Sequence, residues 1–403
     1  MSYFFPTQAT DTFPPNFLKN KMDKDLFIKH SLYLSMLMAS GIRGTDPPAP
    51  FEGIDWIFLI KLSEKQDVIL MIAPAVKKLS LPDDAKALFK ELHNFYLARI
   101  TRQSIEADVV LNSLSSNNIR YIKMKGFHVK DFYPADYMRS RTDIDLCLDK
   151  ENLPKAKPIM ESFGYTLKNT TDYHDEYEKD DFYIFELHSS LVSPKEKYAK
   201  IFSEPFSESE THQSDTDYRL KAEYLYLHLF FHLYHHFTTT GCGIRLFADF
   251  LVFKEYVKDA DFGFIESVIK KYKMTDFYTT LKKLLGYFFY GEKCEENIAN
   301  IASYIFINET TGVYKYHVAS LGFFGKVKYF LKNWFPSAKD LSFRYPVLRK
   351  VPVLLPVCWI RRIFYSLFFN RSAFKQQAES IRTASSQEYK KIKNVRRMAE
   401  KNK

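Results

Sequence analysis

The helical periodicity of this chain is interrupted by one stretch of short, β-rich segments at about residues 118–192. β-branched and aromatic residues gather there in runs of a few residues, as is typical of strands. The predicted strands cover residues 119–124, 143–148, about 165–168 and 182–188, and the predicted helices cover 127–132 and 153–162. This stretch therefore predicts a small sheet in which strands and helices are mixed.

Sequence with helical spacing lies on both sides of this stretch. The helices predicted there cover residues 25–40, 55–80, 84–117, 218–237, 245–256 and 262–335. The predicted fold class is α+β, with a small mixed β-sheet core between N- and C-terminal helical regions. We divide the chain into an irregular leader (1–24), an N-terminal helical region (25–117), the mixed core (118–192), a helical domain (193–336) and a Pro-interrupted basic C-terminal region (337–403).

Two carboxylates in the strand predicted at 143–148 provide the strongest chemical signal. Because successive side chains of a strand alternate faces, Asp143 and Asp145 point the same way, and Ile144 points toward a core. Like charges on one face raise each other's pKa unless a cation lies between them, and Mg²⁺ prefers oxygen ligands. A D-x-D pair alone is more often a solvated strand edge. Glu186, in a later strand, offers a third carboxylate and favours a metal site.

Basic and glycine residues near these carboxylates predict a phosphate-binding region. Lys125 and Gly126 follow the first strand and open a helix, where glycine lets the backbone approach phosphates closely. The competing interpretation is an ordinary strand-to-helix turn. The guanidinium groups of Arg139-Ser140-Arg141-Thr142 could clamp a triphosphate, or this run is a solvated loop. His188 shares a strand face with Glu186 and either contacts a phosphate or packs.

Four histidines, His228, His232, His235 and His236, are spaced to share one face of a predicted aromatic helix. Zinc binding is the less favoured interpretation, because the glutamate of an H-E-x-x-H motif is absent. We expect the histidines to line a cleft or to form hydrogen bonds within packed helices.

The acidic segment from Asp172 to Asp181 is predicted to be a solvated loop before the strand of Glu186. Calcium binding there is not favoured, because the EF-hand pattern is missing.

The net charge of +10 allows binding to polyanions such as nucleotides, nucleic acid or an anionic membrane surface. Nearly all of this charge lies in the tail, residues 361–403, which has 12 Lys and Arg against 3 Asp and Glu. Aromatic and basic residues interleave in Phe323–Phe335 and Trp359–Phe369, which fits a membrane-surface helix and core packing equally. A basic tail could equally contact RNA or DNA.

Four scattered cysteines without a C-x-x-C pair argue against a structural zinc site and a disulfide framework. No signal peptide and no apolar run of about 18 residues is visible in the sequence. We therefore expect a cytoplasmic protein, with peripheral membrane association as the variant that the tail suggests.

The motifs together resemble the bacterial uncharacterised nucleotidyltransferase family, within the DNA polymerase beta-like nucleotidyltransferase superfamily. The family pattern L-K-G, R-x-x-D-I-D-L and E-L-H reads here Met124-Lys125-Gly126, Arg139 to Leu146 and Glu186-Leu187-His188. The family also has an upstream D-W, a helix with spaced histidines and a following R-L-x-x-D. These match Asp55-Trp56, the histidines His228, His232 and His235, and Arg245 to Asp249. The resemblance covers roughly residues 25–350.

The resemblance implies that Asp143, Asp145 and Glu186 are catalytic metal ligands, with Mg²⁺ as the cofactor and Mn²⁺ as the alternative. It assigns Lys125 and Gly126 to the phosphate-binding turn. The superfamily usually has Gly-Gly or Gly-Ser in this turn, so the triphosphate cradle here must differ. Either Lys125 replaces a lost contact or nucleotide binding is weak.

The resemblance also implies that the histidine helix and Arg245 face the substrate cleft. His232 and Asp249 would then contact substrate or orient Arg245.

The implied reaction is transfer of a nucleotidyl group from an NTP such as ATP to an acceptor. A sugar phosphate or small molecule is the first expectation for the acceptor, and a protein or RNA is the second, mildly favoured by the basic tail. The rival is a non-catalytic nucleotide- or partner-binding protein that retains the fold. The altered Lys125-Gly126 turn motivates this rival. The three carboxylates argue against it, because they are costly without a metal.

Overall fold

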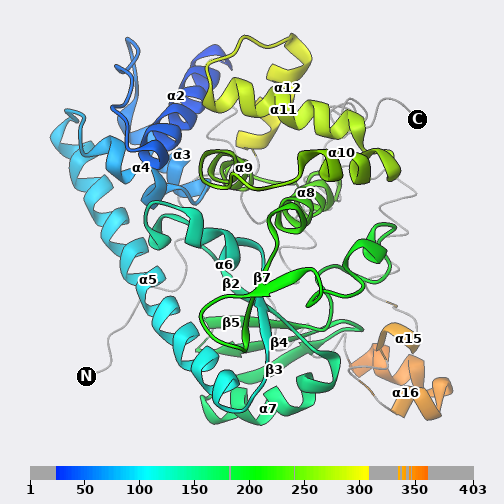
Figure 1. Ribbon diagram of the computed structural model, residues 1–403. Helices are drawn as coiled ribbons and strands as arrows, with labels where there is room; N and C mark the ends of the chain where they lie inside the picture. The colour runs from blue at the N-terminus through cyan, green and yellow to red at the C-terminus, as the bar shows by residue number, and fades with distance from the viewer. Residues whose placement is uncertain are drawn as a thin grey trace, which may run out of the picture.

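The computed structural model describes residues 24–180, 183–239, 241–307, 335, 338–341, 345 and 347–361. In this part of the chain a seven-stranded mixed sheet lies on one side of a group of helices, as Figure 1 shows. The predicted fold class, a small mixed sheet flanked by helical regions, is confirmed. The predicted leader, apart from its last residue, and most of the basic C-terminal region lie outside the described residues, as does the aromatic run from Phe323 apart from Phe335.

The sheet has the strand order β3-β4-β5-β2-β1-β7-β6. Its strands are β1 (Tyr121–Lys123), β2 (Asp143–Leu148), β3 (Thr166–Thr170), β4 (His174–Lys179), β5 (Tyr183–His188), β6 (Ser209–Thr211) and β7 (Asp217–Leu220). The pairs β2–β5 and β1–β7 are parallel, and the remaining pairs are antiparallel. The strands predicted at 119–124, 143–148, 165–168 and 182–188 correspond to β1, β2, β3 and β5.

Strand β4 corrects the prediction of a solvated loop between Asp172 and Asp181. It pairs with β3 on one side and β5 on the other, so it is an interior strand. Only Tyr177 of β4 is fully buried, and the acidic side chains around it are half-buried. Because most positions of β4 are charged, the sequence lacks the alternation of apolar and polar residues that predicts a strand. Tyr177 is the buried residue that packs it against the core.

Strands β6 and β7 are a second correction, because residues 193–336 were predicted to be helical. Backbone pairing explains their position: β7 pairs with Tyr121 and Ile122 of β1, and β6 pairs with β7. The predicted domain boundaries themselves remain a prediction.

One predicted helix, 55–80, is divided in two at Asp67, whose φ is +55°. The helices of the described part otherwise follow the predicted periodicity. They are α2 (Lys24–Arg43), α3 (Trp56–Lys65), α4 (Ile69–Val76), α5 (Asp83–Ser116), α6 (Lys125–Val129), α7 (Leu153–Ser162), α8 (Ala222–Thr238), α9 (Arg245–Tyr256), α10 (Phe262–Lys271), α11 (Thr275–Phe289), α12 (Glu296–Ile307), α15 (Ala338–Leu341) and α16 (Val347–Lys350). Short 3-10 turns are η1 (Lys130–Phe132), η2 (Asp136–Met138), η3 (Lys150–Asn152), η4 (Ala199–Phe202) and η5 (Pro352–Leu354).

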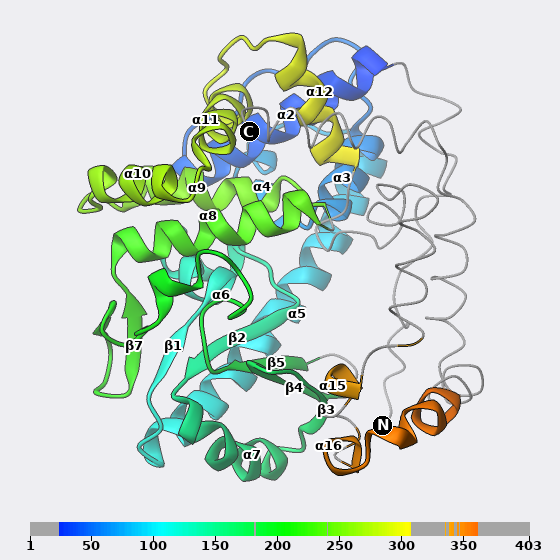
Figure 2. The same ribbon diagram turned by 90° about the vertical axis from the view of Figure 1, so that its right-hand side faces the viewer.

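The two faces of the sheet belong to two hydrophobic cores. Ile144, Leu146 and Leu148 of β2 pack with residues of α5 and α7. Cys147 lies on the opposite face, in the larger core that includes α8 and α9. Because side chains alternate along a strand, Asp143 and Asp145 share the face of Cys147 and point toward the helical group. Figure 2 shows α8 running across this side of the sheet.

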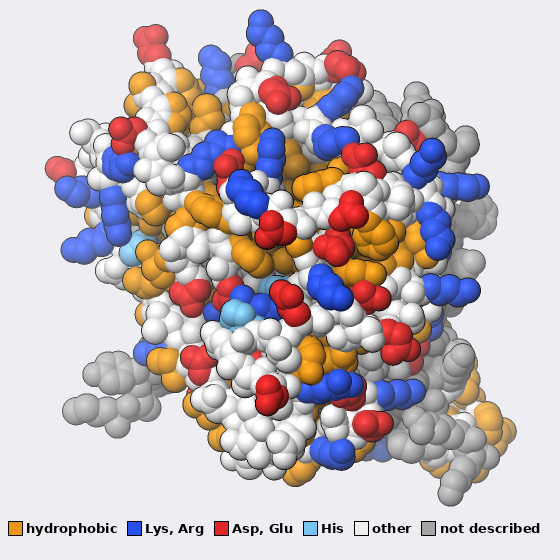
Figure 3. Space-filling model, in the orientation of Figure 1, with side chains coloured by type: hydrophobic (Ala, Val, Ile, Leu, Met, Phe, Trp, Pro, Cys, Tyr) orange, Lys and Arg blue, Asp and Glu red, His pale blue; other side chains and the backbone are white. Residues whose placement is uncertain are grey.

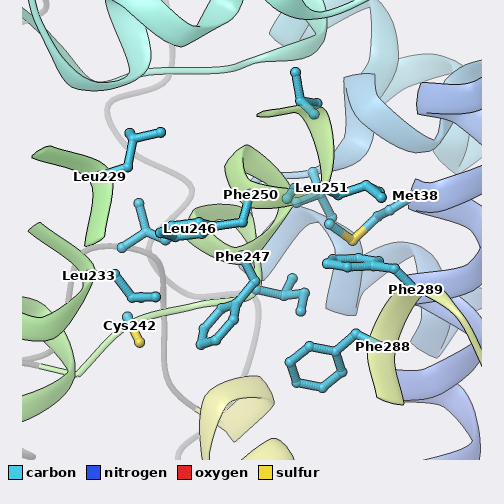
Figure 4. Packing of buried hydrophobic residues seen from close by; sticks show 14 of the residues in the cluster. Met38, Leu229, Leu233, Cys242, Leu246, Phe247, Phe250, Leu251, Phe288 and Phe289 are labelled. Atoms are coloured by element: carbon cyan, nitrogen blue, oxygen red, sulfur yellow. The ribbon is translucent and has the colours of Figure 1, made fainter. Parts of the chain in front are cut away.

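Aromatic side chains fill the larger core. Figure 4 shows Phe247 and Phe250 of α9 among side chains of α8, α11 and α2. The rings of Phe247 and Phe288 meet edge to face with centroids 5.6 Å apart, a favourable arrangement for aromatic pairs. This packing uses the 17% aromatic content of the chain and fixes α8 and α9 beside the sheet.

No helix in the described part of the chain has the length and apolar character needed to cross a membrane. On the face drawn in Figure 3, basic and acidic side chains are interspersed with exposed hydrophobic ones.

His228 predicts a dependence of stability on pH. Its Nε2 lies 3.1 Å from the Leu191 carbonyl oxygen, and burial lowers its pKa from 6.5 to about 4. Between these values the unfolded chain binds a proton that the folded chain does not, so the stabilisation is complete above pH 6.5 and is lost toward pH 4. His228 alone should account for a decrease of up to roughly 3 kcal/mol in the free energy of unfolding.

Urea unfolding at a series of pH values measures this effect. His228→Gln retains an N–H donor for Leu191 and should show a weaker fall in the free energy of unfolding on acidification. His235→Gln, at an exposed position, serves as the control. An equal pH dependence in wild type and His228→Gln would contradict the prediction.

Candidate active site

A pocket of about 310 Å³ lies where the sheet meets α6, α8 and α9. Its walls are Lys125, Gly126, Phe127, Arg139, Arg141, Thr142, Asp143, Asp145, Glu186, His232, His236, Arg245 and Leu246. Ten of these residues were predicted as site residues from the sequence. Ser140, His188 and Asp249 were also predicted, but they are buried and are not part of the pocket wall. Phe127 and Leu246 were not predicted, and His236 was predicted only as one of the four histidines expected to line a cleft or to form hydrogen bonds.

The parallel pairing of β2 with β5 brings the carboxylates together. Asp145 lies directly opposite Glu186 in the register of the two strands. Oxygens of Asp145 and Glu186 and a ring nitrogen of His188 all lie within 4.8 Å of one another. Asp143 lines the same pocket two residues before Asp145.

Lys125 and His188 bind the two central carboxylates. Lys125 Nζ lies 2.5 Å from Asp145 Oδ1 and 3.7 Å from Glu186 Oε2. His188 Nε2 lies 3.0 Å from Asp145 Oδ1 and 3.1 Å from Glu186 Oε2. Two basic groups from different elements therefore meet at the same pair of acidic side chains.

These contacts shift the pKa values of the cluster in opposite directions. Burial acts to raise the pKa of Asp145, but Lys125 and His188 outweigh it and the pKa is lowered. Burial acts to lower the pKa of Lys125, but Asp145 and Glu186 raise it above its ordinary value. Hydrogen bonds to the same carboxylates raise the pKa of His188 against the effect of burial. At neutral pH the Lys125–Asp145 pair is therefore charged.

Asp143 is in a different state. Within the described residues no lysine, arginine or histidine nitrogen forms an ion pair with it, and its hydrogen bond comes from the hydroxyl of Thr142 at 3.4 Å. Burial and the charge of Asp145 raise the pKa of Asp143 to about 6. This carboxylate carries an electrostatic cost that a cation would remove.

The donor set of the pocket suits a divalent cation. Carboxylate oxygens are the ligands that Mg²⁺ and Mn²⁺ prefer, and an imidazole nitrogen is acceptable to Mn²⁺. The described residues contain one group of three such side chains at ligand spacing, namely Asp145, Glu186 and His188. The sequence pattern had left His188 either at a phosphate or packed, and a place beside the metal-binding oxygens was not predicted.

Arg141 is the pocket arginine without a carboxylate partner. Its side chain is only 4% exposed, and its guanidinium lies 5.0 Å above the ring of Phe127. Nη2 donates to the Ser104 hydroxyl at 2.9 Å, whereas Nε and Nη1 have no hydrogen-bond partner among the residues that the structure describes. Burial lowers the pKa of Arg141 to about 10. A buried guanidinium with unused donors beside a pocket is suited to an anionic ligand.

Arg139 is already paired. Its Nε and Nη2 donate to the two carboxylate oxygens of Asp249 at 2.7 and 2.8 Å, and the Tyr133 hydroxyl donates to the same carboxylate at 2.8 Å. A Cβ atom on Gly126 would lie 3.1 Å from this guanidinium, so the glycine allows the close approach. Asp249 therefore orients Arg139, not Arg245 as the sequence suggested.

Arg245 is held by a carboxylate from the N-terminal helical region. Its Nη1 forms an ion pair with Asp67, which lies between α3 and α4, and donates to the Ser140 carbonyl at 3.1 Å. The Ser140 hydroxyl donates to the Asp67 carbonyl at 2.7 Å. Asp67 was not predicted, and no local motif marks it.

The four histidines of the predicted helix lie in three different environments. His232 and His236 line the pocket, and their rings meet edge to face with centroids 4.5 Å apart. His228 is buried, and His235 is exposed and lies 3.3 Å from Glu196. Within the described residues these histidines do not form a group at metal-ligand spacing.

Comparison with known proteins identifies relatives at the level of a family. The sequence pattern of the family described as "Uncharacterised nucleotidyltransferase" matches residues 52–289. No curated protein matches the chain. A similar solved structure is the solution structure of the antibiotic-resistance factor ANT(2'')-Ia, with 13% identity and a TM-score of 0.34 over 45% of this chain and 96% of that one. A TM-score this low establishes no shared fold.

The Arg139–Asp249 pair generates a prediction about stability. Both side chains are almost fully buried, so Asp249→Ala should leave an uncompensated guanidinium and lower the free energy of unfolding by about 3–5 kcal/mol. Urea unfolding measures the change. Glu161→Ala, which removes an exposed ion pair with Lys157, should have little effect. Equal effects of the two variants would disprove the assignment.

Proposed function

The chain belongs to the uncharacterised nucleotidyltransferase family, whose pattern matches residues 52–289 of its 403 residues, and on that premise we propose that it transfers a nucleotidyl group from a nucleoside triphosphate to an acceptor. One observation carries this proposal: three carboxylates and an unpaired arginine converge on the same polar pocket. Carboxylates suit a divalent cation, and the arginine suits a phosphate.

The proposed cofactor is Mg²⁺, with Mn²⁺ as the alternative. Asp143, Asp145 and Glu186 are the residues proposed to hold it, and His188 lies within reach of the same oxygens. When bound, such an ion would neutralise charge that develops on the phosphates during transfer.

Arg141 is the residue that we propose to bind the triphosphate. Its two unpartnered nitrogens give it donors for phosphate oxygens. Arg139 and Arg245 also line the pocket, but Asp249 and Asp67 neutralise them. They contribute shape and hydrogen bonds more than net charge. The helix α6 has only five residues, so its dipole adds little to phosphate binding.

Glu186 is the proposed acceptor of the proton that the attacking hydroxyl loses. Its side chain is 23% exposed, against 4% for Asp145. His188 contacts both carboxylates, but Lys125 Nζ lies 2.5 Å from Asp145 and 3.7 Å from Glu186, so the Lys125 contact is weaker at Glu186. A general base must reach the proton that it removes, and the greater exposure of Glu186 favours it for this role.

The acceptor that we propose first is a sugar phosphate or another small molecule, and a protein or RNA second. A volume of about 310 Å³ lies at the lower end of the range for small-ligand sites. The basic tail, which favoured the second class, lies outside the described residues apart from Arg361. Contact of this tail with an anionic membrane or with nucleic acid remains a separate proposal.

A second candidate is a nucleotide- or partner-binding protein without catalysis. The position of Lys125 favours it, because an ammonium 2.5 Å from Asp145 offsets part of the repulsion between the carboxylates without any metal. Asp143 argues against it, because this carboxylate has no such partner among the described residues. Release of pyrophosphate from NTP separates the two candidates, since a binding protein would retain NTP unchanged.

Metal-dependent nucleotide binding is the first prediction of the proposed function. Calorimetry with ATP, GTP, CTP and UTP, with and without Mg²⁺, should detect binding of one nucleotide that requires the metal. The double variant Asp143→Ala/Asp145→Ala should lose it, because both proposed ligands are gone. Asp149→Ala serves as the control, because Asp149 pairs with Arg120 and does not line the pocket. Binding that survives the double change would refute the assigned site.

Arg141 yields a second prediction. Arg141→Met should weaken NTP binding by about 10- to 100-fold, the value of a lost charge-assisted hydrogen bond of roughly 1.5–3 kcal/mol. The free energy of unfolding should not fall, because the wild-type guanidinium is buried without a carboxylate. Arg120→Met, which lies outside the pocket, is the matched control for nucleotide affinity. A purely structural role would give the reverse result, with lower stability and unchanged affinity.

A further inference from the structure

Lys125 lies where a cation bridging two of the carboxylates would lie. Its Nζ is 2.5 Å from Asp145 Oδ1 and 3.7 Å from Glu186 Oε2. Mg²⁺ requires oxygen ligands at about 2.0–2.1 Å, so an ion shared by these two oxygens would occupy the space of the ammonium. His188 Nε2, at 3.0 and 3.1 Å, contacts the same two oxygens.

The backbone directs Lys125 to this place. Its φ is +46°, in the left-handed region that few residues other than glycine adopt. The residue begins α6 immediately after Met124, whose N–H donates to the Asp145 carbonyl at 3.1 Å. The lysine is thus tied to the strand that carries the carboxylate, and its side chain is only 21% exposed.

Lys125 contacts two of the three carboxylates, and the third is Asp143. Asp143 lines the pocket and has no ion-pair partner among the described residues. The three carboxylates carry three negative charges and Lys125 offsets one of them. The remaining two negative charges match one divalent cation.

We propose that Lys125 is a built-in cation that takes the place of one metal ion, so that the site binds a single divalent ion, at Asp143 and Asp145. This inference rests on the proposed function and adds the number of metal ions and the role of Lys125. It also narrows the proposed ligand set, because Glu186 is assigned to Lys125 and not to the ion. Lys125 holds Asp145 and Glu186 at fixed separation, and the metal enters on the side of Asp143. The nucleotide then meets one metal ion and one ammonium.

Titration of the full chain with Mn²⁺ alone, followed by the electron paramagnetic resonance of the free ion, tests the proposal. Wild type should bind about one Mn²⁺ per chain, and Asp143→Asn should bind none at this site. Lys125→Met should bind about two, because the ammonium no longer fills the second position. Lys130→Met, a lysine outside the pocket that pairs with Asp131 and Asp136, should still bind one.

Two ions in wild type, or one in Lys125→Met, would overturn the proposal. Lys125→Asn is the second variant should methionine prevent folding, because asparagine tolerates a left-handed backbone; circular dichroism checks the fold of each. The wild-type count does not depend on any variant. Two ions in wild type together with pyrophosphate release would overturn the single-ion site alone, whereas absence of nucleotide turnover and of Mn²⁺ binding would overturn the proposed function with it.

Discussion

The parallel pairing of β2 with β5 fixes the position of the carboxylates at the centre of the pocket. It places Asp145 opposite Glu186, on the face of the sheet that the helices cover. Carboxylates gathered in this way repel one another, and burial strengthens the repulsion. The surrounding structure supplies positive groups to this face, beginning with Lys125 and His188.

Most of the buried arginines near the pocket are likewise paired with groups of opposite charge. Arg139 and Arg245 are buried, and each has a carboxylate from a distant part of the chain as its partner. Such pairs cost desolvation energy but hold their members in one geometry. Arg141 differs because, in the described part of the chain, its hydrogen-bond partner is the hydroxyl of Ser104 and not a carboxylate. The net positive charge available to a ligand is therefore concentrated at one guanidinium, although four basic side chains line the wall.

Local pattern was enough to predict much of the fold, because alternation and helical spacing are properties of neighbouring residues. The strand with Asp143 and Asp145 was predicted with its observed bounds, as was the helix from Arg245 to Tyr256. Strand β4 was missed because its exposed positions are charged and only Tyr177 is fully buried. The partners of the arginines could not be predicted. Asp249 is 110 positions from Arg139 and Asp67 is 178 from Arg245, and no periodicity relates residues so far apart.

The long-range ion pairs determine which fragment of the chain can fold independently. An excised mixed core, residues 118–192, would contain Arg139 without Asp249 and Lys123 without Asp217, its buried partner at 3.2 Å. Such a fragment would carry two basic groups evolved for burial and would have to expose them to water. The smallest self-sufficient unit must instead reach from Asp67 to Asp249. That span lies inside residues 52–289, the part of the chain that the family pattern matches.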